Sequence, residues 1–311
     1  MAPLDSSLIE PVLAERIARK KKELESLKPF DKASLKRLEE SFNVEMTYNS
    51  NAIEGNSLSL KETKLVVEDG LTIGGKTMRE HLEATNHMKA IEFVKSLVGK
   101  KKIEEDDVLG LHALILDRID PHNAGFYRKC GVRISGTDYS PPSFHQVPML
   151  MREVYFQLNR KTGAPIGASA ALHMLFVNIH PFVDGNGRTA RLLLNLYLMR
   201  SGYPPVIFLR AERKKYIRTI IDAQSGENPA PFSNFVAKAV ERSLDIYLDS
   251  LGKEQQEYLS LEAAAKHSKY GAEYLGLLAR KGTIGAVKFG RNWKITLEAL
   301  KDYEDSQGTK Q

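Results

Sequence analysis

Apolar residues recur every three or four positions through most of the first 250 residues, as they do on one face of an amphipathic helix. The spacing is clearest on both sides of residue 180, at Leu172, Leu175, Phe176 and Ile179 and then at Leu192, Leu193, Leu196 and Met199. Clusters of turn-forming residues separate the periodic segments. The pattern predicts a mainly α fold, a helical bundle, with helices over residues 6–28, 32–50, 58–69, 77–98, 104–118, 146–161, 165–179, 187–201, 209–224 and 229–251.

The pattern changes after about residue 255. The expected order there is helix, helix, β-hairpin and helix, over residues 259–266, 269–281, 286–295 with a turn at Gly290-Arg291-Asn292, and 296–305. This order resembles a small winged helix-turn-helix, similar to excisionase-type DNA-binding modules. Residues 256–311 hold nine basic and seven acidic residues, a net charge of +2. That charge is low for a DNA binder, so a protein partner is favoured over DNA while both stay open.

The composition is that of an ordinary globular chain: 311 residues, 42% hydrophobic, 27% charged, with a net charge of +6. A single cysteine, Cys130, excludes an internal disulfide framework, and no His or Cys spacing matches a zinc site. The N-terminus lacks the basic and apolar segments of a leader, and no apolar run reaches the ~18 residues of a membrane span. We therefore expect a cytoplasmic protein with no membrane partner.

One segment carries most of the candidate chemistry. The twelve residues from His180 to Arg191 read His-Pro-Phe-Val-Asp-Gly-Asn-Gly-Arg-Thr-Ala-Arg. The flanking periodicity predicts a short loop that leads into a helix N-terminus, where free amides and the peptide dipoles stabilise an anion. Gly185 and Gly187 let the backbone approach a phosphate closely. Arg188 and Arg191 lie on neighbouring positions of one helical face, which indicates a polyphosphate ligand.

Two further side chains of this segment suit phosphate transfer. Asp184 supplies a hard oxygen ligand of the kind that Mg²⁺ takes alongside water and phosphate oxygens. His180 is mostly neutral at pH 7 and can accept a proton from an attacking hydroxyl. The whole run resembles, without a mismatch, the His-Pro-Phe-x-(Asp or Glu)-Gly-Asn-Gly-Arg-x-x-Arg signature of the Fic family. Members of that family mostly transfer AMP from ATP to a protein hydroxyl.

The resemblance implies a role for each matching position. It implies that His180 is the general base and that Asp184 is a magnesium ligand. It also implies that ATP is bound by Gly185, Asn186, Gly187, Arg188 and Arg191. In the related Doc branch, which phosphorylates its target, a lysine stands where this chain has Gly187. The resemblance therefore favours the adenylylating branch, with ATP as co-substrate and Mg²⁺ as cofactor.

A second motif lies upstream of this loop. The segment Ser50-Asn51-Ala52-Ile53-Glu54-Gly55-Asn56 resembles the Ser/Thr-x-x-x-Glu-Gly/Asn inhibitory motif of the Fic family. Ser50 and Glu54 are four residues apart, so on a helix they share a face. In the family this glutamate pairs with the second arginine of the signature, here Arg191, and competes with the γ-phosphate. Some members also use it to remove AMP, so the resemblance implies autoinhibition and leaves removal of AMP through Glu54 as an alternative.

Residues 132–142 are the candidate contact for a target protein. Apolar and polar residues alternate and are followed by turn formers, which predicts a short β-hairpin. In Fic proteins this hairpin is the flap, which binds an extended target segment by main-chain hydrogen bonds. The resemblance assigns this contact to Ile134, Ser135, Gly136 and Thr137. A plain solvent-exposed hairpin fits the sequence equally well.

The resemblance is weakest at the nucleobase pocket. Relatives often carry two adjacent tyrosines there and an asparagine one or two turns later. In this chain Tyr216 is followed by Ile217, and Gln224 stands near the asparagine position. Tyr216 is expected to contact ATP, while UTP, GTP and CDP-choline stay as less favoured donors.

The expected organisation has four parts: N-terminal helices over 1–100 with an inhibitory helix at about 47–55, a catalytic core over 101–252, a winged helix over 255–305 and a tail over 306–311. The expected activity is AMP transfer from ATP to a Ser, Thr or Tyr hydroxyl of a target protein, with self-modification implied. A hydrolase that removes AMP is the alternative. A nucleotide-sensing DNA-binding regulator is disfavoured, because sensing needs neither the base nor the metal ligand.

Overall fold

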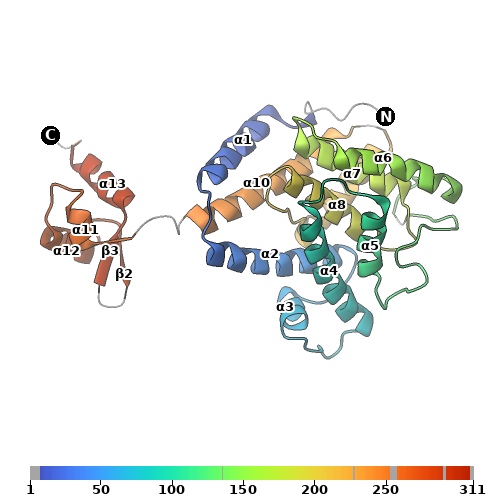
Figure 1. Ribbon diagram of the computed structural model, residues 1–311, viewed down its shortest axis with the longest axis horizontal. Coiled ribbons are helices and arrows are strands. Elements are labelled where there is room, and N and C mark those ends of the chain that lie inside the picture. The colour runs from blue at the N-terminus through green and yellow to red at the C-terminus, as the bar shows by residue number, and fades with distance from the viewer. Residues whose placement is uncertain (1–7, 135, 227, 253–257, 290–291, 309–311) are drawn as a thin grey trace. The chain divides into compact units, whose positions relative to one another are not determined.

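The computed structural model describes residues 8–134, 136–226, 228–252, 258–289 and 292–308. The chain forms two compact units, one from residues up to 26 and 36–247, the other from residues 27–35 and from 248 onward. Helices make up most of the described chain (Figure 1), so the predicted mainly α class is confirmed. Among the described residues, no helix is both long enough and apolar enough to cross a bilayer.

Each helix predicted before residue 252 is present, with its ends shifted by a few residues. The bounds are α1 Pro11–Ser26, α2 Lys32–Ile53, α3 Leu60–Glu68, α4 Met78–Leu97, α5 Glu105–Ile115, α6 Val147–Asn159, α7 Pro165–Ile179, α8 Asn186–Arg200, α9 Arg213–Gln224 and α10 Ala230–Gly252. Short 3₁₀ turns at Phe144–Gln146 and Arg210–Glu212 precede α6 and α9. The starts of α3 and α4 are fixed by reciprocal capping boxes, Ser59 with Glu62 and Thr77 with Glu80.

The helices α7 and α8 form the centre of the larger unit. They pack against each other, and α6, α9, α4 and α5 surround the pair (Figure 1). Nearly every residue of both helices is buried. A helix that is buried on all sides shows little amphipathicity. Because both helices are buried in this way, the loop that joins them is held at both ends. The loop between α7 and α8 is the candidate phosphate-binding segment.

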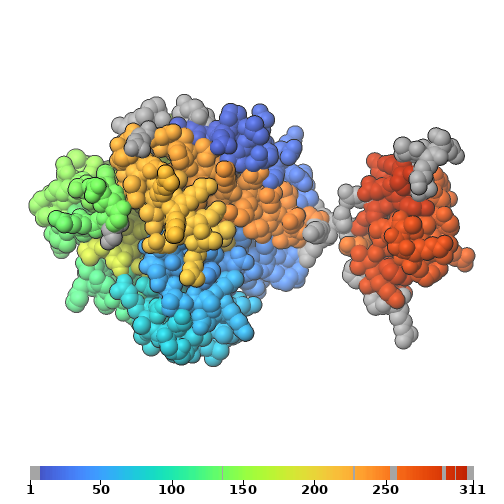
Figure 2. Space-filling view, turned by 180° about the vertical axis from the view of Figure 1, so that it is seen from behind, coloured from blue at the N-terminus to red at the C-terminus, as the bar shows by residue number. Residues whose placement is uncertain are grey.

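The N-terminal helix α1 lies against α10 within the larger unit. Arg16 forms an ion pair of 2.8 Å with Glu241, and Lys20 forms ion pairs with Glu241 at 2.9 Å and with Asp245 at 2.7 Å. Figure 2 shows the N-terminal part of the chain, in blue, beside the orange surface of α10. The first and last helices of the larger unit thus pack against each other.

The smaller unit contains the predicted order of helix, helix, hairpin and helix. Its elements are β1 Leu259–Ser260, α11 Leu261–Ala265, α12 Ala272–Lys281, β2 Ala286–Phe289, β3 Asn292–Ile295 and α13 Leu297–Gly308. The strands are antiparallel in the order β1-β3-β2. A core of Leu275, Leu278, Ile284, Ile295 and Leu300 holds the unit together. The predicted turn residues Gly290 and Arg291 and the predicted change of pattern near residue 255 lie outside the described residues.

The predicted flap differs from the expectation. In place of two paired strands over 132–142, the described residues 131–134 and 136–142 form an irregular loop, and Ser135 lies outside the described residues. An isolated two-stranded hairpin is marginal in water without a third strand or a covering helix. Alternating sequence alone is therefore insufficient to pair these residues.

Candidate active site

The candidate loop begins with an unusual backbone conformation at His180. This residue caps α7 in the left-handed region, with φ 49° and ψ 59°, and its N–H donates to the carbonyl of Phe176 at 3.0 Å. A non-glycine residue in this region costs about 1–3 kcal/mol, so the surrounding structure must hold it there. Phe182, fully buried two residues later, stacks on His112 with ring centroids 3.5 Å apart. The loop is therefore anchored immediately after the candidate base.

The N-terminus of α8 is shaped by Gly185 and Asn186. Gly185 is the N-cap residue at φ 77°, which suits glycine. The side chain of Asn186 accepts a hydrogen bond from the Phe182 amide at 3.0 Å and donates to the Phe182 carbonyl at 2.9 Å. The Nε2 atom of His112 lies 3.0 Å from the carbonyl of Asp184. Asn186 thus holds the loop with its side chain, and the nearby α8 amides are the groups suited to phosphate.

A cavity of about 280 Å³ opens above this helix terminus. It brings together eight residues singled out from the sequence, from segments far apart in the chain: Glu54, Ile134, Thr137, His180, Asn186, Gly187, Arg191 and Tyr216. Its other described walls include Arg213 and an apolar set from α9, which is Ile217, Ile220 and Ile221. A cavity lined both by convergent polar groups and by apolar side chains suits a nucleotide.

The imidazole of His180 is mostly buried at the edge of this cavity. Burial lowers the pKa of His180, and the nearby Arg128 guanidinium lowers it further, while the Glu54 and Asp184 carboxylates act in the opposite direction. The net effect is a lowered pKa, so the ring is neutral at neutral pH. A neutral imidazole beside a cavity can accept a proton from a bound hydroxyl.

Arg191 is almost fully buried and holds the end of α2. Its Nε donates to Ser50 Oγ at 3.0 Å, its Nη2 donates to the Ser50 carbonyl at 2.8 Å, and Nη2 lies 2.8 Å from Glu54 Oε1. The Tyr216 hydroxyl, 3.5 Å from Nη1, is fixed in turn by His173 at 2.9 Å. Burial lowers the pKa of Arg191, but the Glu54 carboxylate and the Tyr216 hydroxyl together outweigh burial, and the pKa is raised. The guanidinium is thus charged and paired.

Glu54 lies one residue beyond α2 and directly over the N-terminus of α8. Gly55, at φ 104°, ends the helix in a conformation that favours glycine. A Cβ atom at Gly187 would overlap Glu54 Oε1 and would lie 3.1 Å from Arg191 Nη1. The carboxylate therefore occupies the place where the helix terminus and Arg191 would hold an anion.

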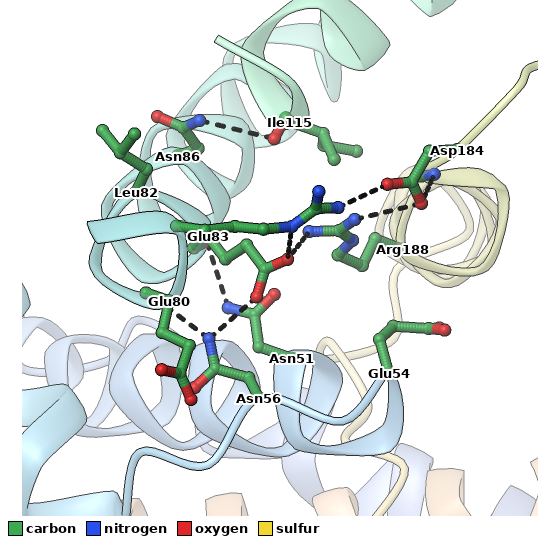
Figure 3. A network of polar contacts seen from close by, with 12 residues as sticks. Asn51, Glu54, Asn56, Glu80, Leu82, Glu83, Asn86, Ile115, Asp184 and Arg188 are labelled. Atoms are coloured by element: carbon green, nitrogen blue, oxygen red, sulfur yellow. Dashed lines mark hydrogen bonds and ion pairs between the residues drawn. The ribbon is translucent and has the colours of Figure 1, made fainter. Parts of the chain in front are cut away.

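Arg188 and Asp184 belong to a second network, formed with α4 (Figure 3). Arg188 is buried, with ion pairs of 3.5 Å to Glu83 Oε1 and to Asp184 Oδ1. Its Nε and Nη1 atoms have no hydrogen-bond acceptor among the described residues. Arg79 of α4 binds Asp184 Oδ2 at 2.7 Å and Glu83 Oε1 at 3.2 Å. Two arginines thus pair with the candidate metal ligand, and one α4 carboxylate pairs with both arginines.

The donor set around Asp184 sets what kind of metal fits. Burial raises the pKa of Asp184, but Arg188, the Gly185 amide and Arg79 together lower it, so the carboxylate is ionised. In the described part of the chain, no group of three or more His, Cys, Asp or Glu side chains could hold a metal. One half-exposed carboxylate suits Mg²⁺ that takes its other ligands from phosphate and water.

Several residues near the cavity were not singled out from the sequence. They are Arg79 and Glu83 on α4, His112 on α5, His173 on α7 and Arg213 at the start of α9. Each is a single polar residue within a helical pattern and carries no motif. Ser135 lies outside the described residues, and Gly136 is not among the described residues that line the cavity.

The fold and the site define a helical bundle with a candidate phosphate-binding loop at a buried helix N-terminus. Residues 102–198 match the model of the Fic/DOC family. The chain is similar to the protein adenylyltransferases Fic of Drosophila virilis, 37% identical over 220 residues, and Culex quinquefasciatus, 36% identical over 239 residues. These matches cover 70% and 75% of this chain but 45% and 47% of the relatives. The chain thus spans less than half the length of these curated relatives.

Solved structures agree with the sequence matches. Fic-1 from C. elegans aligns with a TM-score of 0.71 and 33% identity over 78% of this chain and 74% of that one. A Fic domain containing signaling protein from Bacteroides thetaiotaomicron aligns with a TM-score of 0.70 and 28% identity, over 76% of this chain and 97% of that one. The chain belongs to the Fic/DOC family.

Proposed function

We propose that this chain transfers AMP from ATP to a hydroxyl group of a protein and that Glu54 restrains the reaction. The observation that carries the proposal is the single cavity in which His180, the N-terminus of α8 and Arg191 converge. A neutral base, free amides with a positive dipole end and a buried guanidinium are the groups that phosphoryl chemistry needs. The names of the adenylyltransferase relatives support the choice of ATP as donor.

In the proposed reaction a target hydroxyl attacks the α-phosphorus of ATP. His180 accepts the hydroxyl proton as the new P–O bond forms, and the bond to the β-phosphate oxygen breaks to release pyrophosphate. The α8 amides and Arg191 stabilise the negative charge of the phosphates. Asp184 would hold Mg²⁺, which neutralises charge on the transferring and leaving phosphates. The flap residues Ile134 and Thr137 line the cavity where an extended target segment would lie.

Glu54 restrains this reaction by occupying the γ-phosphate position. Its carboxylate pairs with Arg191 at 2.8 Å and stands over Gly187 at the helix terminus. An ATP molecule that enters must displace the carboxylate or bind with a misaligned triphosphate, since like charges repel. The same carboxylate, half-exposed in the cavity, can orient a water molecule for attack on an AMP ester. Removal of AMP from a modified protein is therefore the second candidate activity.

For the smaller unit we propose a winged-helix module that binds a protein partner. Tyr274 and Leu277 lie on the exposed face of α12, 44% and 38% accessible, and Val287 of β2 is 44% accessible. Apolar side chains on the second helix and the wing suit a protein surface better than a phosphate backbone. DNA remains the alternative, and a gel-shift with random duplex DNA at two salt concentrations distinguishes them, because electrostatic DNA binding weakens as salt rises.

The test of the main proposal is label transfer from α-³²P-ATP with Mg²⁺. The wild-type chain, Glu54→Gly and Glu54→Gly/His180→Ala are each incubated alone and with a cell lysate. We expect strong labelling of the protein itself or of lysate proteins only with Glu54→Gly. γ-³²P-ATP is the control, because AMP transfer leaves the γ-phosphate in pyrophosphate. Label from γ-³²P-ATP would indicate phosphorylation, and no label from either would refute both forms of transfer.

A further inference from the structure

A buried arginine outside the signature loop connects the flap to the base. Arg128 is 2% exposed. Among the described residues, its guanidinium donates only to main-chain carbonyls, through Nε to His180 at 2.8 Å, Nη1 to Cys130 at 3.0 Å, and Nη2 to Pro142 at 2.6 Å and to Ile179 at 3.4 Å. Its own amide donates to the carbonyl of Pro181 at 2.9 Å.

These acceptors belong to three different segments. Cys130 and Pro142 bracket the flap segment, while Ile179 and His180 form the end of α7. The planar guanidinium fork offers five N–H donors in fixed directions, so one side chain can hold all three segments at once. The left-handed conformation of His180 needs such support, because it is strained for any residue that has a Cβ atom.

Arg128 reaches this arrangement without a carboxylate partner in the described part of the chain. Burial lowers its pKa, and Cys130 acts in the opposite direction. A buried cation with no anion nearby is costly unless dipoles compensate for the lost water. The four carbonyl oxygens supply those dipoles. A lysine would offer a single point of attachment, and a neutral glutamine would offer two N–H groups.

We propose that Arg128 is a positioning residue that holds the flap and the catalytic base as one unit. By fixing both ends of the flap segment and the carbonyl of His180, it sets the distance between a flap-bound hydroxyl and the imidazole. This inference rests on the proposed AMP transfer. It assigns to Arg128 the alignment of the target with the base, and leaves the binding of ATP to the loop and to Arg191.

The charge of Arg128 adds a second effect on the same base. It lowers the pKa of His180 together with burial, while Glu54 and Asp184 act in the opposite direction. Removing the guanidinium charge therefore raises the pKa of His180, whereas a lysine in its place keeps a positive charge nearby. Loss of alignment and loss of charge can thus be separated by two substitutions.

The experiment uses the full chain carrying Glu54→Gly, with Arg128→Lys or Arg128→Gln added. Arg200→Lys is the matched control, because Arg200 also donates to main-chain carbonyls, of Lys100 at 2.7 Å and Leu97 at 3.5 Å, and does not line the cavity. Three quantities are measured: the rate of label transfer from α-³²P-ATP, the affinity for ATP with Mg²⁺, and hydrogen exchange over residues 129–142 and 180–184.

We expect Arg128→Lys to bind ATP within about twofold of its parent, to transfer label at least about tenfold more slowly, and to exchange faster in both segments. In Arg128→Gln the acid limb of the pH–rate profile should also move to higher pH, a shift that a smaller folded fraction would not cause. The inference would be overturned if Arg128→Lys and Arg200→Lys had the same rate of label transfer and the same hydrogen exchange. If the Glu54→Gly parent transfers no label, the proposed function fails, and hydrogen exchange still decides whether Arg128 joins the segments.

Discussion

Glu54 and Arg191 form an ion pair of 2.8 Å across the N-terminus of α8. Arg191 is buried and makes its remaining contacts with Ser50 and Tyr216, so the carboxylate and Ser50 together hold the guanidinium. A guanidinium that loses an anion in this setting gains affinity for another one, because burial has already removed its water. The proposed inhibitory contact and the proposed triphosphate site thus share one side chain.

Ser50→Ala tests the hydroxyl that orients Arg191. The substitution removes the acceptor of the Nε hydrogen bond, 3.0 Å long, and leaves a buried donor without a partner. The free energy of unfolding should fall by about 1–3 kcal/mol. Because Arg191 is then held less firmly against Glu54, label transfer should rise above wild type and stay below Glu54→Gly. Denaturant unfolding and the α-³²P assay measure the two effects, with Ser41→Ala on the exposed face of α2 as control.

Gly187→Ala tests how closely Glu54 approaches α8. The added methyl group overlaps Glu54 Oε1, which is the movable end of its side chain. Displacing the carboxylate should therefore increase label transfer several-fold with little loss of stability. In the Glu54→Gly background the same substitution meets no carboxylate, but its methyl group lies 3.1 Å from Arg191 Nη1, where a phosphate would approach the helix, so the rate should fall below that of Glu54→Gly. Equal effects in both backgrounds would show that Glu54 does not lie over Gly187.

Much of the fold was predictable because α7 and α8 carry helical periodicity on both sides of one loop. The order of base, acid, glycines and arginines within that loop is fixed by twelve consecutive residues, so their proximity follows from the sequence alone. The proximity of Ser50 and Glu54 to Arg191 does not follow from the sequence pattern, because Arg191 lies on a helix distant in the chain. Only the family resemblance predicted this contact.

The contacts that sequence could not supply are made by lone polar side chains on other helices. Arg79 and Glu83 lie on α4 among residues that look like an ordinary solvated face, and only packing brings them to Asp184 and Arg188. Arg128 is similar, because its acceptors are backbone carbonyls, which leave no mark in a sequence. The two-residue strand β1 is too short to show a period.

Arg79→Ala tests whether Arg79 competes with a metal at Asp184. The arginine holds Asp184 Oδ2 at 2.7 Å, and Asp184 is the single carboxylate of the proposed metal site. Removing this internal cation should strengthen the binding of Mn²⁺, used as a spectroscopic probe for Mg²⁺, in the presence of ATP. Water proton relaxation reports the affinity without any turnover. Arg152→Ala on the exposed face of α6 is the control, and an unchanged or weaker Mn²⁺ affinity in Arg79→Ala contradicts the prediction.

Buried histidines should make the larger unit sensitive to mild acid. Burial lowers the pKa of His87 and of His173 to about 3 and that of His112 to about 4. In the unfolded chain each of these histidines has a pKa of about 6.5. Below this pH the unfolded state therefore binds more protons than the folded state. Stability is therefore lost as pH falls from about 6.5 towards 4, by up to about 1.4 kcal/mol per pH unit for each histidine.

Urea unfolding followed by circular dichroism at pH 7, 6 and 5 measures this slope. His87→Gln should reduce it, whereas His122→Gln, at an exposed position, should not. The range stops at pH 5 because Glu80 and Glu241, whose hydrogen bonds lower their pKa to about 2, add their own loss of stability only below about 4.5. A slope that His87→Gln leaves unchanged would mean that His87 is already protonated or accessible in the folded state.

Asn56→Ala tests whether α4 holds Glu54 in its inhibitory place. Asn56 follows Glu54 by two residues, and its Nδ2 donates to the Glu80 carbonyl at 3.1 Å and to Glu83 Oε2 at 2.9 Å (Figure 3). Its Oδ1 accepts the Leu58 amide at 3.0 Å. Removing these bonds frees the end of the segment that carries Glu54, so label transfer should rise and stability should fall by about 1–3 kcal/mol.

The combination with Glu54→Gly decides the mechanism of this effect. If Asn56 acts only by holding the inhibitory carboxylate, Asn56→Ala adds no label transfer once Glu54 is glycine, because nothing remains to be held. If it acts through Glu83 and Arg188 on the phosphates, the double variant is slower than Glu54→Gly alone. Because Asn56 binds Glu83, and Glu83 lies 3.5 Å from Arg188, both routes are physically connected, and the non-additivity of the two substitutions separates them.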